Sequence, residues 1–533
     1  MRRIACLLLW VLTSALSAGA QSPEAAKSEQ PAGTGAITGR VLDETGQPVF
    51  NAEVRASESG GFDTGATAAT DEDGKFRLDG LSPRAYSLSV LAPGFVLESQ
   101  GRAGGALHYL GDVVSLRVRK GAVITGKVAR ADGEPVIAVR ITVTMVRDEE
   151  GARVTDDDSW ESTDDRGIYR VFGLREGTYI VSAGGDARQF FRMSASFLSE
   201  DVPTYFPSST LEDAGEVSVR SGQEVSGIDI TYRGDRGHKA SGTVVGTLDD
   251  SVWVSVRSAA HSVEVGSTGV DRAGGTFEFD ALADGEYEVT ATRFGDRQTQ
   301  SFAGPVKFKV RGADVTGLRL VLAPVASLAG KVVLEGLPAP DAQAPCPEKS
   351  SRVLTEIVVV LDRDAPDGNN GSGRSSSAPV AKDGAFTEMG LRPAKIHLGA
   401  RLPDDGCYVR SITRTEAGKK TPVDVARDGL AMSAGQAVDG VVVTVSAGAA
   451  GVAGKIVPAA EGQAVPDGVR VHLVPAEADA GDAVVRFYEV KAERDGTFEI
   501  RNVAPGAYRA LAVEDKAAGD EAAVRPAAWD AAT

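Results

Sequence analysis

Short runs in which apolar and polar residues alternate recur along the whole chain. The clearest are FRL at residues 76–78, YSLSV at 86–90 and VRVHL at 469–473. An alternation of two residues is the period of a β-strand that buries one face. No segment of helical length keeps an apolar period of 3.6 residues, so we expect an all-β chain of short strands separated by Gly and Pro turns.

These strands belong to a unit that repeats five times, which is the strongest signal in the sequence. The units open with a small residue and a glycine, followed two positions later by Val or Ile: Gly39, Gly126, Gly242, Gly330 and Gly454. A turn glycine precedes a second strand, and an Asp-Gly pair of this kind is typical of tight hairpins: Gly74, Gly167, Gly275, Gly384 and Gly496. The twelfth residue after each turn glycine starts another strand: Tyr86, Tyr179, Tyr287, Ile396 and Tyr508.

We expect each unit to form a small antiparallel β-sandwich, so that the fold is a tandem array of about five. The repeats place the sandwiches at 35–119, 120–234, 235–323, 324–447 and 448–533, after a signal peptide at 1–20 and a linker at 21–34. The second unit carries an insertion near 190–215, and the fourth a Gly/Ser/Asn/Pro-rich loop at 365–379, expected to be flexible. Because the junctions are short, we expect a semi-rigid rod. The fifth unit stops soon after its Tyr508 strand, so it is either shortened or completes its sheet differently.

The N-terminus has the pattern of a secretory signal. Arg2 and Arg3 precede an apolar run at 4–12, and Ala-Gly-Ala at 18–20 offers a cleavage site. The alternative is a membrane anchor, but the apolar run is shorter than the roughly 20 residues that span a bilayer. We therefore expect a secreted or periplasmic protein that does not span the membrane.

Export also affects the reading of the cysteines. Cys6 would leave with the signal peptide, so Cys346 and Cys407 remain in the mature chain. Under oxidising conditions we expect them to form a disulfide, and two unrelated thiols are the alternative.

Composition and charge narrow the range of functions. The net charge of −17 argues against nucleic acid or an anionic membrane surface as a partner. Five His and three Cys in 533 residues leave little material for metal or thiol chemistry. We expect no cofactor.

The motif D-G-x-F followed by P-G-x-Y, after a G-x-V strand, resembles the carboxypeptidase regulatory-like domain family. The closest matches are residues 73–86 and 495–508, whereas the third unit has Ala-Gly-Gly at the turn and the fourth lacks the Tyr. The resemblance covers nearly the whole mature chain. It implies a transthyretin-like or starch-binding-like sandwich in extracytoplasmic accessory modules, often tied to carbohydrate recognition, surface assembly or attachment to an enzyme. It does not imply peptidase activity, because the regulatory domain carries no catalytic residues.

Two sequence patterns resemble metal-binding motifs, and we favour a metal site at neither of them. His261 and Glu264 match the H-x-x-E of zinc carboxypeptidases, but the third ligand would have to be His397, which belongs to another unit. Asp71 to Gly74 suggests calcium, but the residues required at the ends of such a loop are missing, and a hairpin turn explains the run. A zinc carboxypeptidase, or an accessory subunit of one, is the enzyme alternative.

Ligand binding by a sugar-binding sandwich needs exposed aromatic rings. The candidates are Trp253, which alternates with three valines, Trp160 in an acidic segment, and Tyr205 and Phe206 in the insertion. We expect a non-catalytic exported binding or scaffold protein, with a polysaccharide as first-choice ligand. The alternative is protein–protein assembly or adhesion, with an envelope protein as the partner.

Overall fold

The computed structural model describes residues 35–514 with gaps, and all structural statements concern that part of the chain. Outside it lie residues 1–34, 61–63, 99–105, 150, 152, 155–157, 186–200, 250, 296–299, 336–353, 365–374, 404–405, 417, 419–420, 459–464, 466–468, 478–482, 494 and 515–533. The proposed signal peptide, the linker and the first part of the insertion therefore lie outside the described residues.

The described residues form a tandem array of β-sandwiches, which confirms the predicted fold class. We call them modules 1 to 5, covering 35–120, 122–232, 238–324, 326–447 and 450–514. The exact domain boundaries stay a prediction. Helical structure in the described ranges is confined to single turns: η2 (Leu354–Glu356), α1 (Val425–Asp428) and η3 (Val484–Arg486).

Module 1 pairs a four-stranded sheet, β4-β1-β7-β6, with a three-stranded sheet, β3-β2-β5. Its strands are β1 (Gly35–Leu42), β2 (Glu53–Glu58), β3 (Thr64–Ala69), β4 (Lys75–Leu81), β5 (Tyr86–Leu91), β6 (Phe95–Leu97) and β7 (Val113–Lys120). Module 2 repeats this plan, with the insertion adding β13 to one sheet. Its strands are β8 (Ala122–Ala129), β9 (Arg140–Asp148), β10 (Asp158–Ser162), β11 (Ile168–Leu174), β12 (Gly177–Ala183), β13 (Thr204–Tyr205), β14 (Glu216–Val219), β15 (Glu224–Val225) and β16 (Ile230–Thr231).

Module 3 has sheets β20-β17-β23 and β19-β18-β21-β22-β24. Its strands are β17 (His238–Val245), β18 (Val252–Ser258), β19 (Glu264–Gly269), β20 (Thr276–Leu282), β21 (Gly285–Arg293), β22 (Ser301–Val310), β23 (Val315–Val321) and β24 (Ala323–Pro324). Module 4 has sheets β28-β25-β33-β30-β31 and β27-β26-β29-β32. Its strands are β25 (Ala326–Glu335), β26 (Val358–Arg363), β27 (Ser375–Pro379), β28 (Ala385–Leu391), β29 (Ala394–Arg401), β30 (Cys407–Arg414), β31 (Val423–Asp424), β32 (Leu430–Met432) and β33 (Ala437–Ala447).

One prediction inside module 4 is wrong in part. Residues 375–379, expected in a flexible loop, form β27 and pair with β26 from Val358 to Asp362. A Ser-rich sequence reads as a loop, yet small polar side chains are tolerated on an edge strand, and Pro379 stands at the strand end. Residues 365–374 of that loop lie outside the described part.

Module 5 is smaller in the described residues. Its sheets are β34-β37 and β36-β35-β38. Its strands are β34 (Ala450–Lys455), β35 (Val469–Pro475), β36 (Tyr488–Lys491), β37 (Thr497–Val503) and β38 (Tyr508–Glu514).

The first strand of modules 1 to 4 lies between two neighbours. On one side it pairs antiparallel with the strand after the turn glycine, and on the other it pairs parallel with the last strand of the module. We call that last strand the closing strand: β7 in module 1, the β15–β16 segment in module 2, β23 in module 3 and β33 in module 4. Each of these modules has its own buried core between its sheets.

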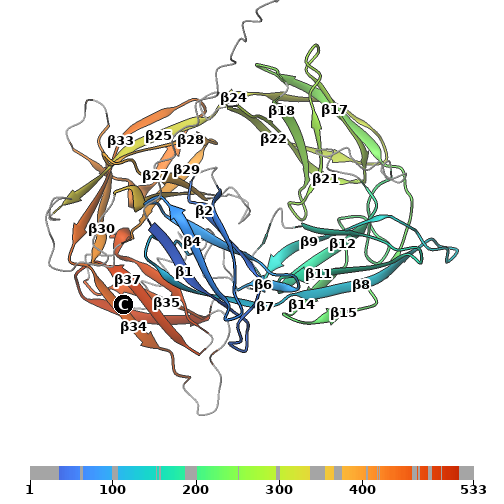
Figure 1. Cartoon of the computed structure of the whole chain (residues 1–533). Helices are drawn as coiled ribbons and strands as arrows, with labels where there is room; N and C mark the ends of the chain where they lie inside the picture. The colour runs from blue at the N-terminus through green and yellow to red at the C-terminus, as the bar shows by residue number, and fades with distance from the viewer. Residues whose placement is uncertain are drawn as a thin grey trace, which may run out of the picture.

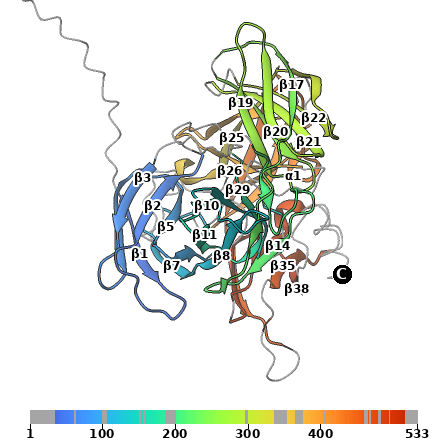
Figure 2. The same cartoon turned by 90° about the vertical axis from the view of Figure 1, so that its right-hand side faces the viewer.

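The array is not the rod that the short junctions predicted. Arg84 of module 1 donates a hydrogen bond to the backbone of Val380 in module 4 at 3.5 Å. Lys491 of module 5 forms an ion pair with Glu149 of module 2 at 3.4 Å. The chain curves round so that modules 4 and 5 return to modules 1 and 2 (Figures 1 and 2). Junction length limits only how consecutive modules are joined, so it carried no information about contacts between non-consecutive ones.

Candidate functional site

The histidines considered for zinc lie in different places with different partners. His261 lies in the turn between β18 and β19, not in a strand, and Glu264 at the start of β19 forms an ion pair with Arg257 at 3.7 Å. Burial lowers the pKa of His261, because charging it would require desolvation against module 2. His397 lies on β29 of module 4, 3.1 Å from Asp364.

No group of three or more His, Cys, Asp or Glu side chains in the described ranges is arranged to hold a metal ion. The acidic turn at residues 71–74, for which calcium was the less favoured interpretation, is a hairpin turn. The Asp71 carboxylate accepts hydrogen bonds from the backbone N–H groups of Asp73 and Lys75, at 3.0 and 2.8 Å. Asp164 does the same for Arg166 and Ile168 in module 2. The repeated aspartate therefore holds the turn.

The described residues include one of the two cysteines that were expected to form a disulfide. Cys407 is buried at the start of β30, and Cys346 lies outside the described residues. The disulfide between them stays a prediction.

The four aromatic candidates differ in how far their side chains are exposed. Trp160 on β10 is 61% exposed, with the Arg140 guanidinium 5.0 Å from its ring centroid. Trp253 is half-buried and alternates with the buried valines of β18, so it faces away from the core as expected. Tyr205 is buried and Phe206 is half-buried against the module 2 core.

Tyr205 is buried because the insertion folds over the outer face of the module 2 sheet. It packs there with Val146, Ile180 and Leu211 and with Val263 of module 3. The insertion therefore fills the junction between two modules, and its Tyr205 ring is not open to a sugar. Sequence reasoning missed this, because the partner Val263 is far away along the chain. Of the four candidates, Trp160 has the most exposed ring.

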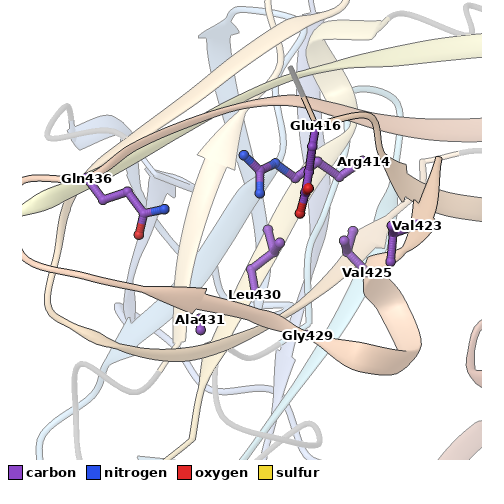
Figure 3. A pocket seen from close by; sticks show the side chains of 8 residues that line it. All are labelled: Arg414, Glu416, Val423, Val425, Gly429, Leu430, Ala431 and Gln436. Carbon is purple, nitrogen blue, oxygen red and sulfur yellow. The ribbon is translucent and has the colours of Figure 1, made fainter. Parts of the chain in front are cut away.

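A cavity of about 330 Å³ opens at one end of module 4, where β30, α1 and β32 meet (Figure 3). Val423, Val425 and Leu430 give it apolar walls, and Arg414 and Glu416 bring charges to it. Its volume is at the lower end of the range for small-ligand sites. Its described lining contains no Ser, Cys or His, so it offers no side chain of the usual nucleophile–base pairs.

The α1 turn that forms one wall of this cavity is fixed at both ends. The Asp424 carboxylate accepts hydrogen bonds from the N–H groups of Ala426 and Arg427, and Gly429 ends the turn with a φ of 66°. The Arg414 Nε donates to the carbonyl of Asp439 at 3.0 Å. These contacts fix the wall of the cavity that α1 forms.

The largest departure from the repeat lies in module 5. In the described residues β34 pairs only with β37, and no closing strand lies on its other side. Five of the six residues of β34 are exposed. Val452 of β34 and Ile456, the residue after the strand, are half-buried, whereas the equivalent Ile37 and Val41 of module 1 are fully buried.

The rest of the module 5 core is exposed in the same way. Phe498 and Tyr508 are half-buried, whereas their equivalents are 2–5% exposed in the modules that carry an aromatic residue there. Those equivalents are Phe76, Tyr169, Phe277, Phe386, Tyr86, Tyr179 and Tyr287. The fully buried apolar cluster of module 5 consists of Val471, Leu473, Ile500 and Val503. Within the described residues, module 5 is therefore the module whose first strand and core are most exposed.

The fold defines the class: a protein built from several β-sandwich modules in tandem. Residues 36–107 match the profile of the carboxypeptidase regulatory-like domain family, so the resemblance inferred from the repeats is confirmed for module 1. No curated protein matches the chain.

Solved structures match over longer stretches at low identity. They include the Bacillus anthracis TIE protein, 15% identical, covering 54% of this chain and 51% of that one, with a TM-score of 0.15. GBS52, the minor pilin of Streptococcus agalactiae, is 13% identical and covers 40% of this chain and 98% of its own, with a TM-score of 0.21. BcpA, the major pilin subunit of Bacillus cereus, is 11% identical and covers 54% and 99%, with a TM-score of 0.13.

No helix of the described part is long and apolar enough to cross a membrane.

Proposed function

We propose that this chain is an exported, non-catalytic scaffold that assembles with other proteins, and that module 5 is the site of assembly. The observation that carries the proposal is that, within the described residues, five of the six residues of β34 are exposed and Phe498 and Tyr508 beside them are half-buried. An unpaired strand edge is a template for pairing with another chain, and apolar side chains left half-exposed beside it gain from being covered.

Export is part of the proposal and rests on the N-terminal pattern of Arg2, Arg3 and the apolar run at 4–12. Sequencing of the mature N-terminus tests it. The proposal predicts a chain that starts at Gln21, and a retained residue 1 would contradict it.

The assembly proposal is tested by placing a photo-crosslinking residue at Lys455, at the end of β34, in the chain made by its own organism. Lys127 is the matched control, because it occupies the same position of module 2, where β16 already lies alongside. We expect a defined protein adduct from position 455 and intramolecular adducts from position 127. Adducts that are the same at both positions, or none at 455, would reject assembly at this edge.

A second candidate function is glycan binding at Trp160, and the exposed ring favours it. Trp160 pairs with Thr142 on the neighbouring strand β9, and Thr142 pairs with Ser182 on the next strand, β12. Two residues with hydroxyl groups therefore stand in line with the ring on adjacent strands. Binding of the whole chain to a polysaccharide array, lost in Trp160→Ala and retained in Trp253→Ala, would support this function. No binding by the intact chain would reject it.

A further inference from the structure

Module 1 has an exposed sheet face on which cations gather, although the whole chain has a net charge of −17. Lys75 and Arg77 lie on β4, Arg40 lies on β1 and Arg117 lies on β7, and all four are exposed. The residues next to them along each strand are buried, so the four side chains share the outer face of the sheet. We call these four residues the cationic face.

The register of the strands brings the cations close together. Arg40 pairs with Lys75 of β4 on one side and with Ser115 of β7 on the other. Arg117 lies two residues beyond Ser115, so it is the diagonal neighbour of Arg40. Residues in direct register on adjacent strands are about 5 Å apart and diagonal neighbours about 7–8 Å. Lys75, Arg40 and Arg117 therefore form a line of positive charge across three strands.

Two of the four cations are available to a ligand without breaking a contact. In the described part of the chain, the side chains of Arg40 and Arg117 form no hydrogen bond or ion pair. The two cations of β4 each pair with an exposed aspartate two positions away, Asp73 and Asp79, at 2.7 and 2.8 Å. Ion pairs between exposed side chains are weak, so an anionic ligand is able to replace either carboxylate.

The repeated fold does not itself require this face. The positions equivalent to the cationic face carry two cations in module 2, none in module 3 and one in module 4. In chain order they are Lys127, Ile168, Arg170 and Thr231; Thr243, Thr276, Glu278 and Val321; Lys331, Ala385, Thr387 and Thr444. Arg170 also pairs with Glu224 at 3.1 Å. The concentration of positive charge is thus a property of module 1 and not of the sandwich.

The geometry favours a polymer that lies across the strands over a peptide that extends the sheet. β1 and β7 both have a strand on each side, so their backbone groups are not open to an added strand. A ligand over them meets side chains only. Thr38 and Ser115 stand among the cations, in register with Arg77 and Arg40, and their hydroxyl groups can both donate and accept hydrogen bonds. Sugar hydroxyls are suitable partners for such groups.

We propose that the cationic face of module 1 binds an acidic polysaccharide, whose carboxylates pair with the four cations while its hydroxyls contact Thr38 and Ser115. The site is separate from module 5 and from Trp160, so it goes beyond the proposed function. The net charge of the chain sets the condition for binding. At about 0.1 M salt the Debye length is about 10 Å, so the face acts on a polymer in contact with it while much of the acidic surface elsewhere is screened.

Binding of the full-length protein to immobilised polygalacturonate in about 0.1 M salt tests the proposal. We expect saturable binding to this polymer and none to neutral dextran. Raising the salt to about 0.5 M should weaken binding, because the pairs that exposed cations form are screened. Poly-glutamate offers the same carboxylates without sugar hydroxyls, and it should compete less well than free polygalacturonate.

The chain offers a matched pair of variants. Arg40→Gln with Arg117→Gln removes two cations that hold no described side chain in place, and should weaken binding at least about tenfold because two charge-assisted contacts are lost. Lys127→Gln with Lys331→Gln is the control. These lysines occupy the Arg40 position in modules 2 and 4, and the net charge changes by the same amount. The control should bind like wild type.

No binding to polygalacturonate by the wild-type chain, or equal binding by the two double variants, would overturn the inference. Competition by poly-glutamate as strong as that by polygalacturonate would reject a polysaccharide as the ligand. Trp160→Ala should leave binding unchanged. Loss of binding in Trp160→Ala, with binding kept in the Arg40→Gln and Arg117→Gln variant, would overturn the inference in favour of the Trp160 site.

Discussion

The repeated tyrosine has a structural role that its position alone explains only in part. In modules 1, 2, 3 and 5 its hydroxyl donates a hydrogen bond to the backbone carbonyl four residues earlier, at 2.7–3.0 Å. The donors are Tyr86, Tyr179, Tyr287 and Tyr508. The bond ties the Pro/Gly turn to the strand that follows it, which is why a tyrosine stands there in preference to a phenylalanine.

Removing that hydroxyl should cost stability without changing the fold. We expect Tyr179→Phe to lower the free energy of unfolding of module 2 by about 1 kcal/mol, because the carbonyl of Arg175 loses its partner. Hydrogen exchange of the β12 amides measures the change. Tyr408→Phe is the control, because the Tyr408 hydroxyl makes no hydrogen bond among the described residues; equal effects of the two variants would contradict the assignment.

The first strands of modules 1 to 4 each carry a glycine that should tolerate no side chain, because an added Cβ would lie 2.0–2.5 Å from a carbonyl oxygen of the closing strand. Gly126→Ala places a Cβ 2.0 Å from the carbonyl oxygen of Ile228. We expect a loss of about 1–3 kcal/mol in the unfolding free energy of module 2, since the two strands must move apart. Gly269→Ala, at a site with nothing within 4 Å of the added atom, serves as control in denaturant titrations of the same chain. A neutral Gly126→Ala would contradict this steric requirement.

At the level of elements, the contact of η2 with module 1 brings acidic groups together. Glu356 on η2 is 5% exposed, and burial, with a smaller contribution from the charge of Asp112, raises its pKa to about 7. Tyr109 of module 1 lies in the same contact, and burial raises the pKa of its hydroxyl. The charge of Arg401 lowers this pKa and the charge of Glu356 raises it.

This contact should make stability depend on pH. Between about pH 4.5 and 7 the unfolded chain releases the Glu356 proton while the folded chain keeps it, so stability falls as pH rises through that window. The loss is on the order of 2–3 kcal/mol and is complete above about pH 7. Glu356→Gln should remove this part of the pH dependence of the denaturation midpoint. An unchanged slope between pH 5 and 7 would show that Glu356 titrates normally.

The sequence predicted best what depends on neighbours along the chain. The turn glycines adopt positive φ as expected, from 65° at Gly275 to 84° at Gly384, and the alternating runs are strands. β18 buries alternate residues as predicted, whereas β35, which holds the run at 469–473, is buried on both faces. The prediction failed where the deciding partner is remote. Tyr205 read as an exposed ring because Val263, which covers it, lies in the next module. The prediction also failed at residues 375–379, for a local reason: their Ser-rich sequence has no alternation of apolar and polar residues, although they pair with the preceding strand β26.

In the whole molecule, a charged cluster joins modules 1, 2 and 5. The Arg119 guanidinium of module 1 lies within 3.6 Å of Glu98, Glu149 and Glu176, and Glu149 also meets Lys491 of module 5. Burial opposes ionisation of Glu149, but the hydrogen bond from Arg119 and the charge of Lys491 outweigh it and hold its pKa below the usual range. The arrangement binds the end of the curved array to its beginning.

A curved array and a rod differ in one directly measurable contact. Treatment of the dilute full-length chain with a carbodiimide should form an amide between Lys491 and Glu149, whose charged atoms lie 3.4 Å apart. Mass spectrometry of the digested monomer should identify this cross-link, and Lys491→Gln should abolish it. A monomer that yields cross-links only between consecutive modules would contradict the curved array and support the expected rod.

The central claim is that the first strand of module 5, β34, lacks among the described residues the closing strand that pairs with the first strand of modules 1 to 4. Hydrogen exchange of the free full-length chain compares the five equivalent strands, β1, β8, β17, β25 and β34, in one experiment. The account predicts strong protection of the first four and fast exchange along the outer edge of β34, which has no partner strand there among the described residues. Protection of β34 equal to that of the other four would contradict it.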